Sequence, residues 1–294
     1  MLPDVRTNGD IYSIPKFDLD RGDIEGFMEA LKGFHAEFRD CFSREESRTN
    51  FFHYAVGQFS EIGRKSIEPI ALNVENAKVR AIQRFVSDAI WDEKGIVAKY
   101  RKTILDDLGE ENGILIFDES GFQKKGGDSA GVARQYCSNL GKVENCQVGV
   151  FAAYASSRGY SLVDRRLFVP EKWFGESYGE RKRKLNFPKG LNFATKPRLA
   201  VEMLDDIVEE RTLPIKYIAA DSIYGNSPEF IAAVEKYPDK TYFANVPSDV
   251  RCWSRPPETE ERAYTYAGET RYGRVPKRGG REKADDGYRS GERH

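Results

Sequence analysis

Two short apolar runs in this 294-residue chain each end in an aspartate. The first run is Ile114-Leu115-Ile116-Phe117-Asp118, and the second is Ile215-Lys216-Tyr217-Ile218-Ala219-Ala220-Asp221. Short runs with β-branched and aromatic side chains are typical of buried strands. Ligands of open α/β sheets bind beyond the carboxyl ends of the strands. The two runs therefore predict a sheet with an acidic site at one edge, assembled by folding rather than by local sequence.

The first part of the chain has a helical pattern. Apolar side chains recur at helical spacing from Asp23 to Phe38. The stretch Ser43-Arg44-Glu45-Glu46 has the form of a capping box, which would begin a second helix. Two further helices are expected over 77–89 and 93–108. Residues 1–110 thus predict an all-helical domain.

After Gly113 the pattern changes to that of strands. The expected strands are 114–118, 146–154, 160–169, 215–220 and 241–246, with helices over 196–211 and 227–236. The polar, glycine-rich segment 122–143 is expected to be a loop that lines the site. An order of three strands, a helix, a strand, a helix and a strand, with an aspartate on the first and fourth strands, fits an RNase H-like core. We assign this core to residues 111–253.

Residues 254–294 differ in composition from the rest. Pro256-Pro257 is followed by a segment dominated by Tyr, Gly, Arg and Glu, and the last residues, 274–294, contain almost no apolar side chains. Such a composition is typical of disorder. The predicted fold class is therefore α+β, with an N-terminal α-helical domain, an RNase H-like mixed α/β domain and a disordered C-terminal tail.

Scarce histidine and cysteine limit the metals that the chain can bind. There are three histidines, and the four cysteines form no CxxC pair, which indicates reduced thiols rather than a zinc site. Any metal would need oxygen ligands, and these suit Mg²⁺ or Mn²⁺.

Composition also bears on location and partners. No apolar run approaches the roughly 20 residues that span a bilayer, and residues 1–10 lack the apolar region of a secretion signal, so a cytoplasmic protein is expected. The net charge of −1 is not that of a strongly basic nucleic-acid-binding domain. Basic residues nevertheless cluster at Arg181-Lys182-Arg183-Lys184 and around Lys277-Arg278.

Several stretches extend the two aspartate motifs into a longer pattern. They are Ile116-Phe117-Asp118-Glu119-Ser120-Gly121-Phe122-Gln123-Lys124-Lys125-Gly126, the segments 131–137 and 140–148, Asp164-Arg165-Arg166-Leu167-Phe168-Val169-Pro170 with Trp173, and Ala220-Asp221-Ser222-Ile223-Tyr224-Gly225. In the helical half they are 64–70, 83–85 and Trp91-Asp92. With these motifs the chain resembles the DDE transposases of prokaryotic insertion sequences over about residues 20–253. Residues 131–148 are the most specific part of the resemblance.

The resemblance implies a function and its partners. It implies an RNase H-like catalytic domain that cleaves transposon-end DNA and transfers a strand to a target, using two Mg²⁺ or Mn²⁺ ions. Asp118 and Asp221 would be the first two metal ligands. The N-terminal helices would bind the transposon ends, double-stranded DNA would be the partner, and a homodimer and association with the nucleoid are expected from the family.

Cations near the motifs are candidate contacts to DNA phosphates. They are Lys124, Lys125, Arg134, Lys142, Arg181 and Arg183. Lys124 and Lys125 would contact phosphate near the metals. The alternative for each of these residues is a solvated surface, which is the ordinary place of a basic cluster.

The third acidic residue of the family pattern, a glutamate on a helix beyond a β-rich insertion, is not found after Asp221. Glu119 would point to the opposite side of its strand from Asp118, so it is not expected to be a ligand. The alternative for an isolated aspartate is that it caps a turn or a helix, and Gly225 would shape the turn after Asp221 through a positive φ. The chain is thus expected to be truncated at its C-terminus, within or just after the start of the insertion. The alternative function is an inactive form that only binds DNA or competes with the intact enzyme.

Overall fold

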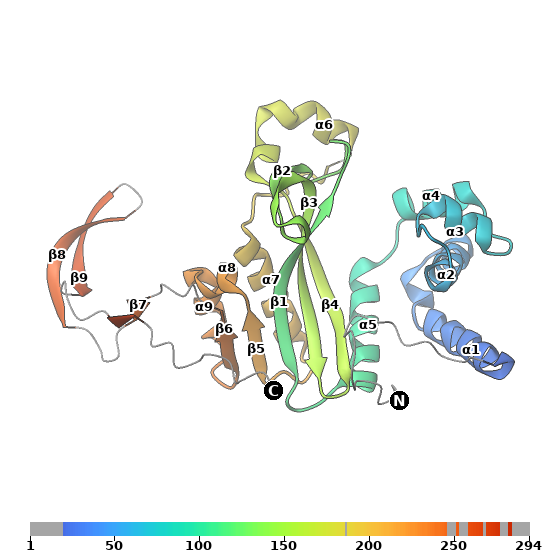
Figure 1. Cartoon of the computed structure of the whole chain (residues 1–294), viewed down its shortest axis with the longest axis horizontal. Helices are drawn as coiled ribbons and strands as arrows, with labels where there is room; N and C mark the ends of the chain where they lie inside the picture. Colours follow the sequence, from blue (N-terminus) through green and yellow to red (C-terminus); the bar gives the residue numbers. More distant parts are fainter. Residues whose placement is uncertain are drawn as a thin grey trace. The chain divides into compact units, whose positions relative to one another are not determined.

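The computed structural model describes residues 20–185, 187–245, 251–252, 258–266, 269–276 and 282–283 (Figure 1). The chain divides into two compact units between Thr103 and Ile104, within helix α5 (Glu93–Leu108). No helix in the described part is both long and apolar enough to cross a bilayer.

The described part of the first unit is built from helices (Figure 1). They are α1 (Arg21–Glu37), α2 (Glu45–Phe59), α3 (Ile67–Asn73), α4 (Val79–Ser87) and the first turns of α5. The four expected helices are confirmed, whereas the short helix α3 is not predicted by the sequence pattern. The capping box expected at Ser43 is wrong, because α2 begins one residue later than that box requires, after Arg44, and Arg44 makes no side-chain cap.

Aromatic rings form much of the core of the first unit. Phe38, Phe42 and Phe85 are almost fully buried, and the rings of Phe42 and Phe85 lie 5.9 Å apart. A second cluster is aliphatic and contains Ile70 and Ile82, both fully buried. The aromatic residues of the helical pattern thus pack the interior.

The second unit contains a mixed sheet with β1 near its centre. β1 (Ile114–Gln123) pairs antiparallel with β3 (Lys142–Ser156) and parallel with β5 (Tyr217–Ala220). β5 pairs parallel with β6 (Thr241–Ala244), and β4 (Gly159–Phe168) pairs antiparallel with the other edge of β3. The resulting order, β4-β3-β1-β5-β6, is the RNase H-like arrangement that the sequence predicts.

The segment 122–143 is not the continuous loop that its composition predicts. β1 continues to Gln123, and β2 (Ala133–Cys137) pairs antiparallel with the start of β3 before a short 3-10 helix at Ser138–Leu140. Buried Ala133 and Cys137 alternate in β2 with exposed Arg134 and Tyr136. One face of β2 is exposed to solvent and carries polar residues. The composition of the segment therefore resembles that of a loop.

Part of the segment 254–294 also forms strands. β8 (Thr259–Tyr266) and β9 (Glu269–Pro276) make an antiparallel hairpin, and β10 (Glu282–Lys283) pairs with β7 (Arg251–Cys252). Disorder is expected from composition for residues 274–294, and within that stretch the last residues of β9 and the two residues of β10 are extended. The rest of residues 274–294 lies outside the described part. Thr, Tyr and Val in β8 and β9 favour an extended backbone even where the overall composition is polar.

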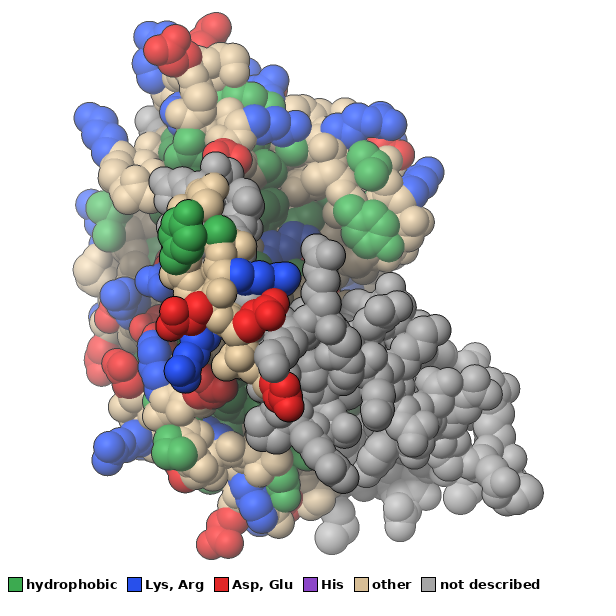
Figure 2. All heavy atoms as spheres, turned by 90° about the vertical axis from the view of Figure 1, so that its left-hand side faces the viewer, with side chains coloured by type: hydrophobic (Ala, Val, Ile, Leu, Met, Phe, Trp, Pro, Cys, Tyr) green, Lys and Arg blue, Asp and Glu red, His purple; other side chains and the backbone are tan. Residues whose placement is uncertain are grey.

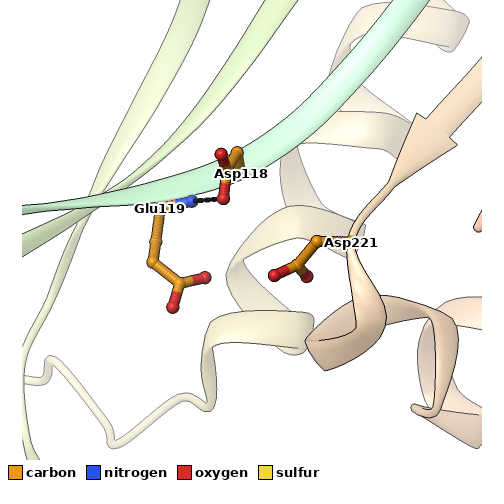
Figure 3. A group of neighbouring side chains, drawn as sticks. All are labelled: Asp118, Glu119 and Asp221. Carbon is orange, nitrogen blue, oxygen red and sulfur yellow. Dashed lines mark hydrogen bonds between the residues drawn. The ribbon is translucent and has the colours of Figure 1, made fainter. Parts of the chain in front are cut away.

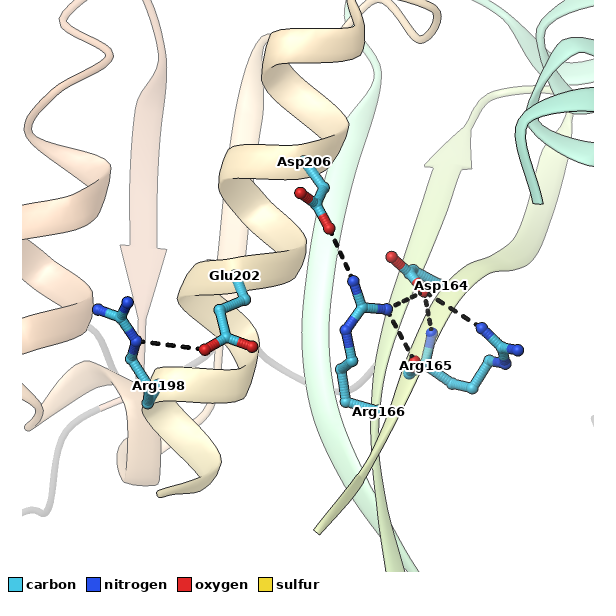
Figure 4. A network of polar contacts seen from close by, with 6 residues as sticks. All are labelled: Asp164, Arg165, Arg166, Arg198, Glu202 and Asp206. Atoms are coloured by element: carbon cyan, nitrogen blue, oxygen red, sulfur yellow. Dashed lines mark hydrogen bonds and ion pairs between the residues drawn. The ribbon is translucent and has the colours of Figure 1, made fainter. Parts of the chain in front are cut away.

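Helix α7 (Lys196–Glu210) packs against β3 and β4 through Ala200, Met203 and Leu204, which are fully buried. Arg166 of β4 binds this helix (Figure 4). It donates to Asp164 Oδ1 at 2.6 Å and to Asp206 Oδ2 of α7 at 2.7 Å. The nearly buried carboxylate of Asp164 orients Arg166 on the strand, while the partner on the helix, Asp206, is 60% exposed. The contact with the helix is therefore that of a largely exposed ion pair, which stabilises only modestly.

Two short helices follow β5, namely α8 (Ser222–Gly225) and α9 (Pro228–Val234). Gly225 does not have the positive φ that the sequence reasoning assigns to it. A Cβ atom there would instead lie 2.6 Å from Ala244 Cβ and 2.7 Å from the Asn245 carbonyl oxygen. Glycine is required because α8 lies close to the end of β6.

We expect Gly225→Ala to lower the free energy of unfolding by about 1–3 kcal/mol, because the added methyl group overlaps β6. Gly126→Ala is the matched control, since a Cβ at Gly126 would meet no atom within 4 Å. Urea unfolding of both variants measures the difference. Equal stability of the two variants would contradict the close packing of α8 on β6.

Candidate active site

The pairing of β1 with β5 brings the two aspartates together. The last parallel pair in the register is Phe117 with Ala220. Asp118 follows Phe117 within β1, and Asp221 is the first residue after β5. Neighbouring strands lie about 4.8 Å apart, so side chains at the same level of two strands are within reach of each other. Figure 3 shows the two aspartates on adjacent elements.

One backbone hydrogen bond orients each aspartate. Asp118 Oδ1 accepts from the Glu119 N–H at 2.7 Å, and Asp221 Oδ1 accepts from the Ile223 N–H at 2.9 Å, which caps α8. The interpretation of an aspartate as a cap therefore holds for Asp221. Within the described residues, however, no hydrogen bond reaches the second oxygen of either side chain. Each aspartate thus keeps one oxygen for a ligand.

Glu119 is a third acidic residue of the site. One carboxylate oxygen from each of Asp118, Glu119 and Asp221 lies within 4.8 Å of the others. Asp118 is exposed, Asp221 is half-buried and Glu119 is buried. Glu119 leaves the strand on the side opposite to Asp118, as its position predicts, but its long side chain brings the carboxylate beside Asp221 (Figure 3). The opposite-side position that the sequence predicts is thus found, although the carboxylate of Glu119 still reaches the two aspartates. We call these three residues the acidic trio.

Two side chains from other elements hold Glu119. Lys196 Nζ, at the first residue of α7, donates to Glu119 Oε1 at 2.8 Å, and Tyr224 Oη of α8 donates to Oε2 at 3.2 Å. The Lys196 side chain is 18% exposed and that of Glu119 is 6% exposed, so the ion pair is largely shielded from water. Glu119 therefore joins β1, α7 and α8 directly beneath the aspartates. Sequence reasoning gives Lys196 no role and assigns Tyr224 only to a turn.

The surroundings of the trio shift two pKa values. The side chain of Asp118 reaches solvent, yet the protein around its carboxylate removes enough water to raise its pKa. The negative charges of Asp221 and Glu119 raise the pKa further, while the Glu119 N–H and Lys196 oppose the rise. Burial and then the charge of Glu119 raise the pKa of Tyr224, so its hydroxyl stays protonated and remains a donor.

The candidate DNA-binding cations lie away from the trio. Lys124 and Lys125 follow the end of β1, so Lys124 is about 20 Å along the strand from Asp118. Arg134 of β2 pairs with Asn145, whose side-chain amide donates to the Lys124 carbonyl at 2.6 Å. Lys142 is opposite Cys137 at the start of β3. These four cations share one end of the sheet, so the structure does not place Lys124 and Lys125 beside the aspartates.

Arg181 and Arg183 belong to helix α6 (Gly179–Lys184), which lies at the same end of the unit as β2 (Figure 1). The guanidinium of Arg181 lies over the ring of Tyr178 at 5.2 Å, whereas Arg183 is exposed. Lys184 pairs with Asp128 of the segment after β1 at 3.4 Å. The six sequence candidates thus gather around β2, the adjoining loop and α6.

Comparison of the sequence with known proteins identifies the family of the chain. The family model of the DDE superfamily endonucleases matches residues 37–288. The chain belongs to this family. It is also similar to a probable transposase for insertion sequence element IS701 from Microchaete diplosiphon, at 28% identity over 200 residues. The matched part is 68% of this chain and 49% of that protein, so the chain spans about half the length of this relative. The resemblance found in the sequence motifs is confirmed.

For Asp118→Asn, we expect a higher melting temperature than that of the parent at pH 7 without metal. The raised pKa of Asp118 means that its ionisation disfavours the folded state. This penalty grows as the pH rises from the ordinary pKa of an aspartate, about 3.9, through the raised pKa of Asp118. The gain in melting temperature should therefore disappear below about pH 3.9. Thermal unfolding with a chelator at both pH values measures it, with exposed Asp107→Asn as the control. A variant less stable than the parent at pH 7 would contradict the expectation that the ionised carboxylate of Asp118 destabilises the folded state.

Lys196→Met should lower the free energy of unfolding by about 3 kcal/mol, because the shielded carboxylate of Glu119 loses its cation. The double variant Glu119→Gln, Lys196→Met should recover part of this loss, since the amide of glutamine carries no charge. Lys189→Met, at an exposed lysine, is the matched control. Chemical denaturation of the parent, of Glu119→Gln, of Lys196→Met and of the double variant measures the coupling between the two side chains. Strictly additive effects would show that the ion pair contributes nothing.

Proposed function

We propose that this chain acts as a DNA transposase on the ends of an insertion sequence, by metal-dependent phosphodiester hydrolysis and strand transfer. The observation that carries the proposal is the meeting of Asp118 and Asp221 at adjacent strand ends in a chain of the DDE family. Asp118 and Asp221 would be catalytic residues and would hold Mg²⁺ or Mn²⁺. The similar IS701 protein, described as a probable transposase, supports the same substrate class.

The donor set of the site fits a hard divalent cation. In the described part of the chain, the trio offers carboxylate oxygens alone, without histidine or cysteine. Three carboxylates face one ammonium group, that of Lys196. Oxygen ligands with excess negative charge suit Mg²⁺ or Mn²⁺ better than zinc.

The chain's own residues would orient and shield this chemistry. When bound, divalent cations would activate the attacking hydroxyl and stabilise the leaving oxygen. Asp118 and Asp221 each present one oxygen that is free of backbone hydrogen bonds, and these oxygens would hold the cations. Lys196 and Tyr224 keep Glu119 in place, so that its negative charge faces the same space. Rigid carboxylates are most of what phosphoryl transfer requires of the protein.

The position of Glu119 also favours a second candidate function, a form that binds DNA or competes with an intact enzyme without cutting. Both oxygens of Glu119 already accept hydrogen bonds, from Lys196 and from Tyr224. In the described residues, Glu119 is the sole carboxylate that joins the two aspartates. If the engaged Glu119 does not complete the metal shell, two ligands would bind the cations weakly and DNA binding would remain.

The proposed partners follow from the substrate. Double-stranded DNA at transposon ends and at the target would bind along the cations Lys124, Lys125, Arg134, Lys142, Arg181 and Arg183, while the helical first unit would contact the ends. A homodimer would hold two ends together. Acting on chromosomal DNA places such an enzyme in the cytoplasm, at the nucleoid.

Cleavage of labelled duplexes taken from the DNA that flanks the coding sequence tests the proposal. In Mg²⁺ or Mn²⁺ we expect strand cleavage that falls at least about 100-fold in Asp118→Ala and in Asp221→Ala, because each removes a metal ligand. Asp107→Ala, an exposed aspartate outside the trio, should cleave like the parent.

The other outcomes separate the two candidate functions. Specific binding of the flanking duplexes without cleavage by the parent would reject the active enzyme and support the binding form. Cleavage that survives both alanine variants would contradict the assigned site. Absence of both binding and cleavage would contradict both functions.

A further inference from the structure

Two adjoining cavities lie in the connection between β4 and α7. The larger has a volume of about 530 Å³ and the smaller of about 310 Å³. Phe174, Gly190 and Leu191 line both of them. We call this feature the 174–198 groove. Its residues belong to the end of the unit that carries α6 (Figure 1). The upper part of Figure 2 shows Lys and Arg side chains there, together with hydrophobic ones and some Asp and Glu side chains.

The larger cavity combines positive charge with aromatic rings. Lys182, Arg183 and Lys189 line it together with Phe174 and Phe187, and no carboxylate is among its lining residues. In the described part of the chain, none of these three cations is in an ion pair. The cations therefore retain their charge for a ligand from outside the chain.

Ring contacts fix the apolar side of the groove. Phe187 stacks on the fully buried Trp173, with ring centroids 6.0 Å apart and an angle of 22° between the planes. Phe174 meets Phe187 edge to face at 6.1 Å. A ring held in this way loses little conformational freedom when a planar ligand stacks against it.

This lining selects one class of ligand. A small anion alone would not require aromatic rings, and an apolar segment would not require three free cations. A nucleotide has both a planar base and a phosphate, and proteins bind single strands by stacking bases on aromatic side chains beside basic residues. The volume of the larger cavity is in the range of ordinary ligand sites.

The groove is connected to the acidic trio by direct contacts. Phe193 of the smaller cavity lies 6.5 Å from the ring of Phe168, and Lys196 Nζ lies 5.7 Å from that ring. Lys196 in turn donates to Glu119. A DNA strand at the trio is therefore within reach of the groove over a few nucleotides.

We propose that the 174–198 groove binds one unpaired nucleotide of the DNA substrate, a few nucleotides away from the acidic trio. Its base stacks on Phe187, and Lys182, Arg183 and Lys189 hold the phosphates on either side. This site rests on the proposed function, since it takes the substrate to be DNA. It gives the basic block of α6 a role in holding an unpaired strand in addition to its proposed contact with a duplex.

Binding of a fluorescein-labelled oligothymidylate to the full chain, measured by anisotropy over a series of salt concentrations, tests the groove. Phe187→Ala and Phe187→Leu should each weaken binding about tenfold, since both remove the stacking ring while leucine keeps the packing on Trp173. Lys189→Gln should reduce the slope of log affinity against log salt by about 0.7, the value for one phosphate contact to a single strand. Exposed Tyr160→Ala and Lys172→Gln are the matched controls.

Two results would overturn the site. The first is that Phe187→Leu binds the oligothymidylate as tightly as the control Tyr160→Ala does. The second is that Lys189→Gln shows the same slope of log affinity against log salt as the control Lys172→Gln. Cleavage and binding of the flanking duplexes are measured for the same variants. These measurements distinguish failure of the groove proposal from failure of the proposed transposase function. If the duplexes are still cut in an Asp118-dependent way while the groove variants bind single strands normally, the groove proposal fails and the transposase function stands. If the parent binds neither duplex nor single strand, both fail.

Discussion

The parallel register of β1 with β5 is the constraint on which the site depends. It places Phe117 opposite Ala220, and the residue that follows each of them in the chain is an aspartate. Side chains alternate between the two faces of a strand, so a slip of one residue would turn one aspartate away from the other. The buried faces of the strands prevent this slip, because a shift of β1 would take Leu115 and Phe117 out of the core and a shift of β5 would take out Ile218. Core packing thus sets the geometry of the polar site.

Three carboxylates in one place work against stability, and the fold offsets this with one shielded cation. Lys196 can serve in this way because α7 begins at that residue and is fixed to β4 by Arg166, bound to Asp206 on the helix and to Asp164 on the strand. Removing one member of such a pair costs far more than the pair itself contributes. The clustered negative charges therefore lower the stability of the folded unit, as is common at functional sites.

Sequence reasoning could predict the features that are encoded locally. Asp118 and Asp221 each follow an apolar run, and the run itself indicates a strand. The approach of Glu119, Lys196 and Tyr224 depends on three elements far apart in the chain, and no local pattern encodes it. Exposed polar side chains, such as Arg134 in β2 and Glu261 in β8, conceal these two strands in the sequence. Gly225 is needed for a close approach to β6 and not for a positive φ. Its role depends on the position of β6, which is known only once the sheet is assembled.

The connection between β4 and α7 joins the 174–198 groove to the acidic trio. Its first part carries the aromatic rings and cations of the 174–198 groove, and its last part sets the start of α7 and hence the position of Lys196. The ring of Phe168 contacts both sides, since Phe193 meets it from the groove and Lys196 lies over it from the acidic trio. Phe168 is therefore the residue at which the aromatic packing of the groove meets the cation that holds Glu119.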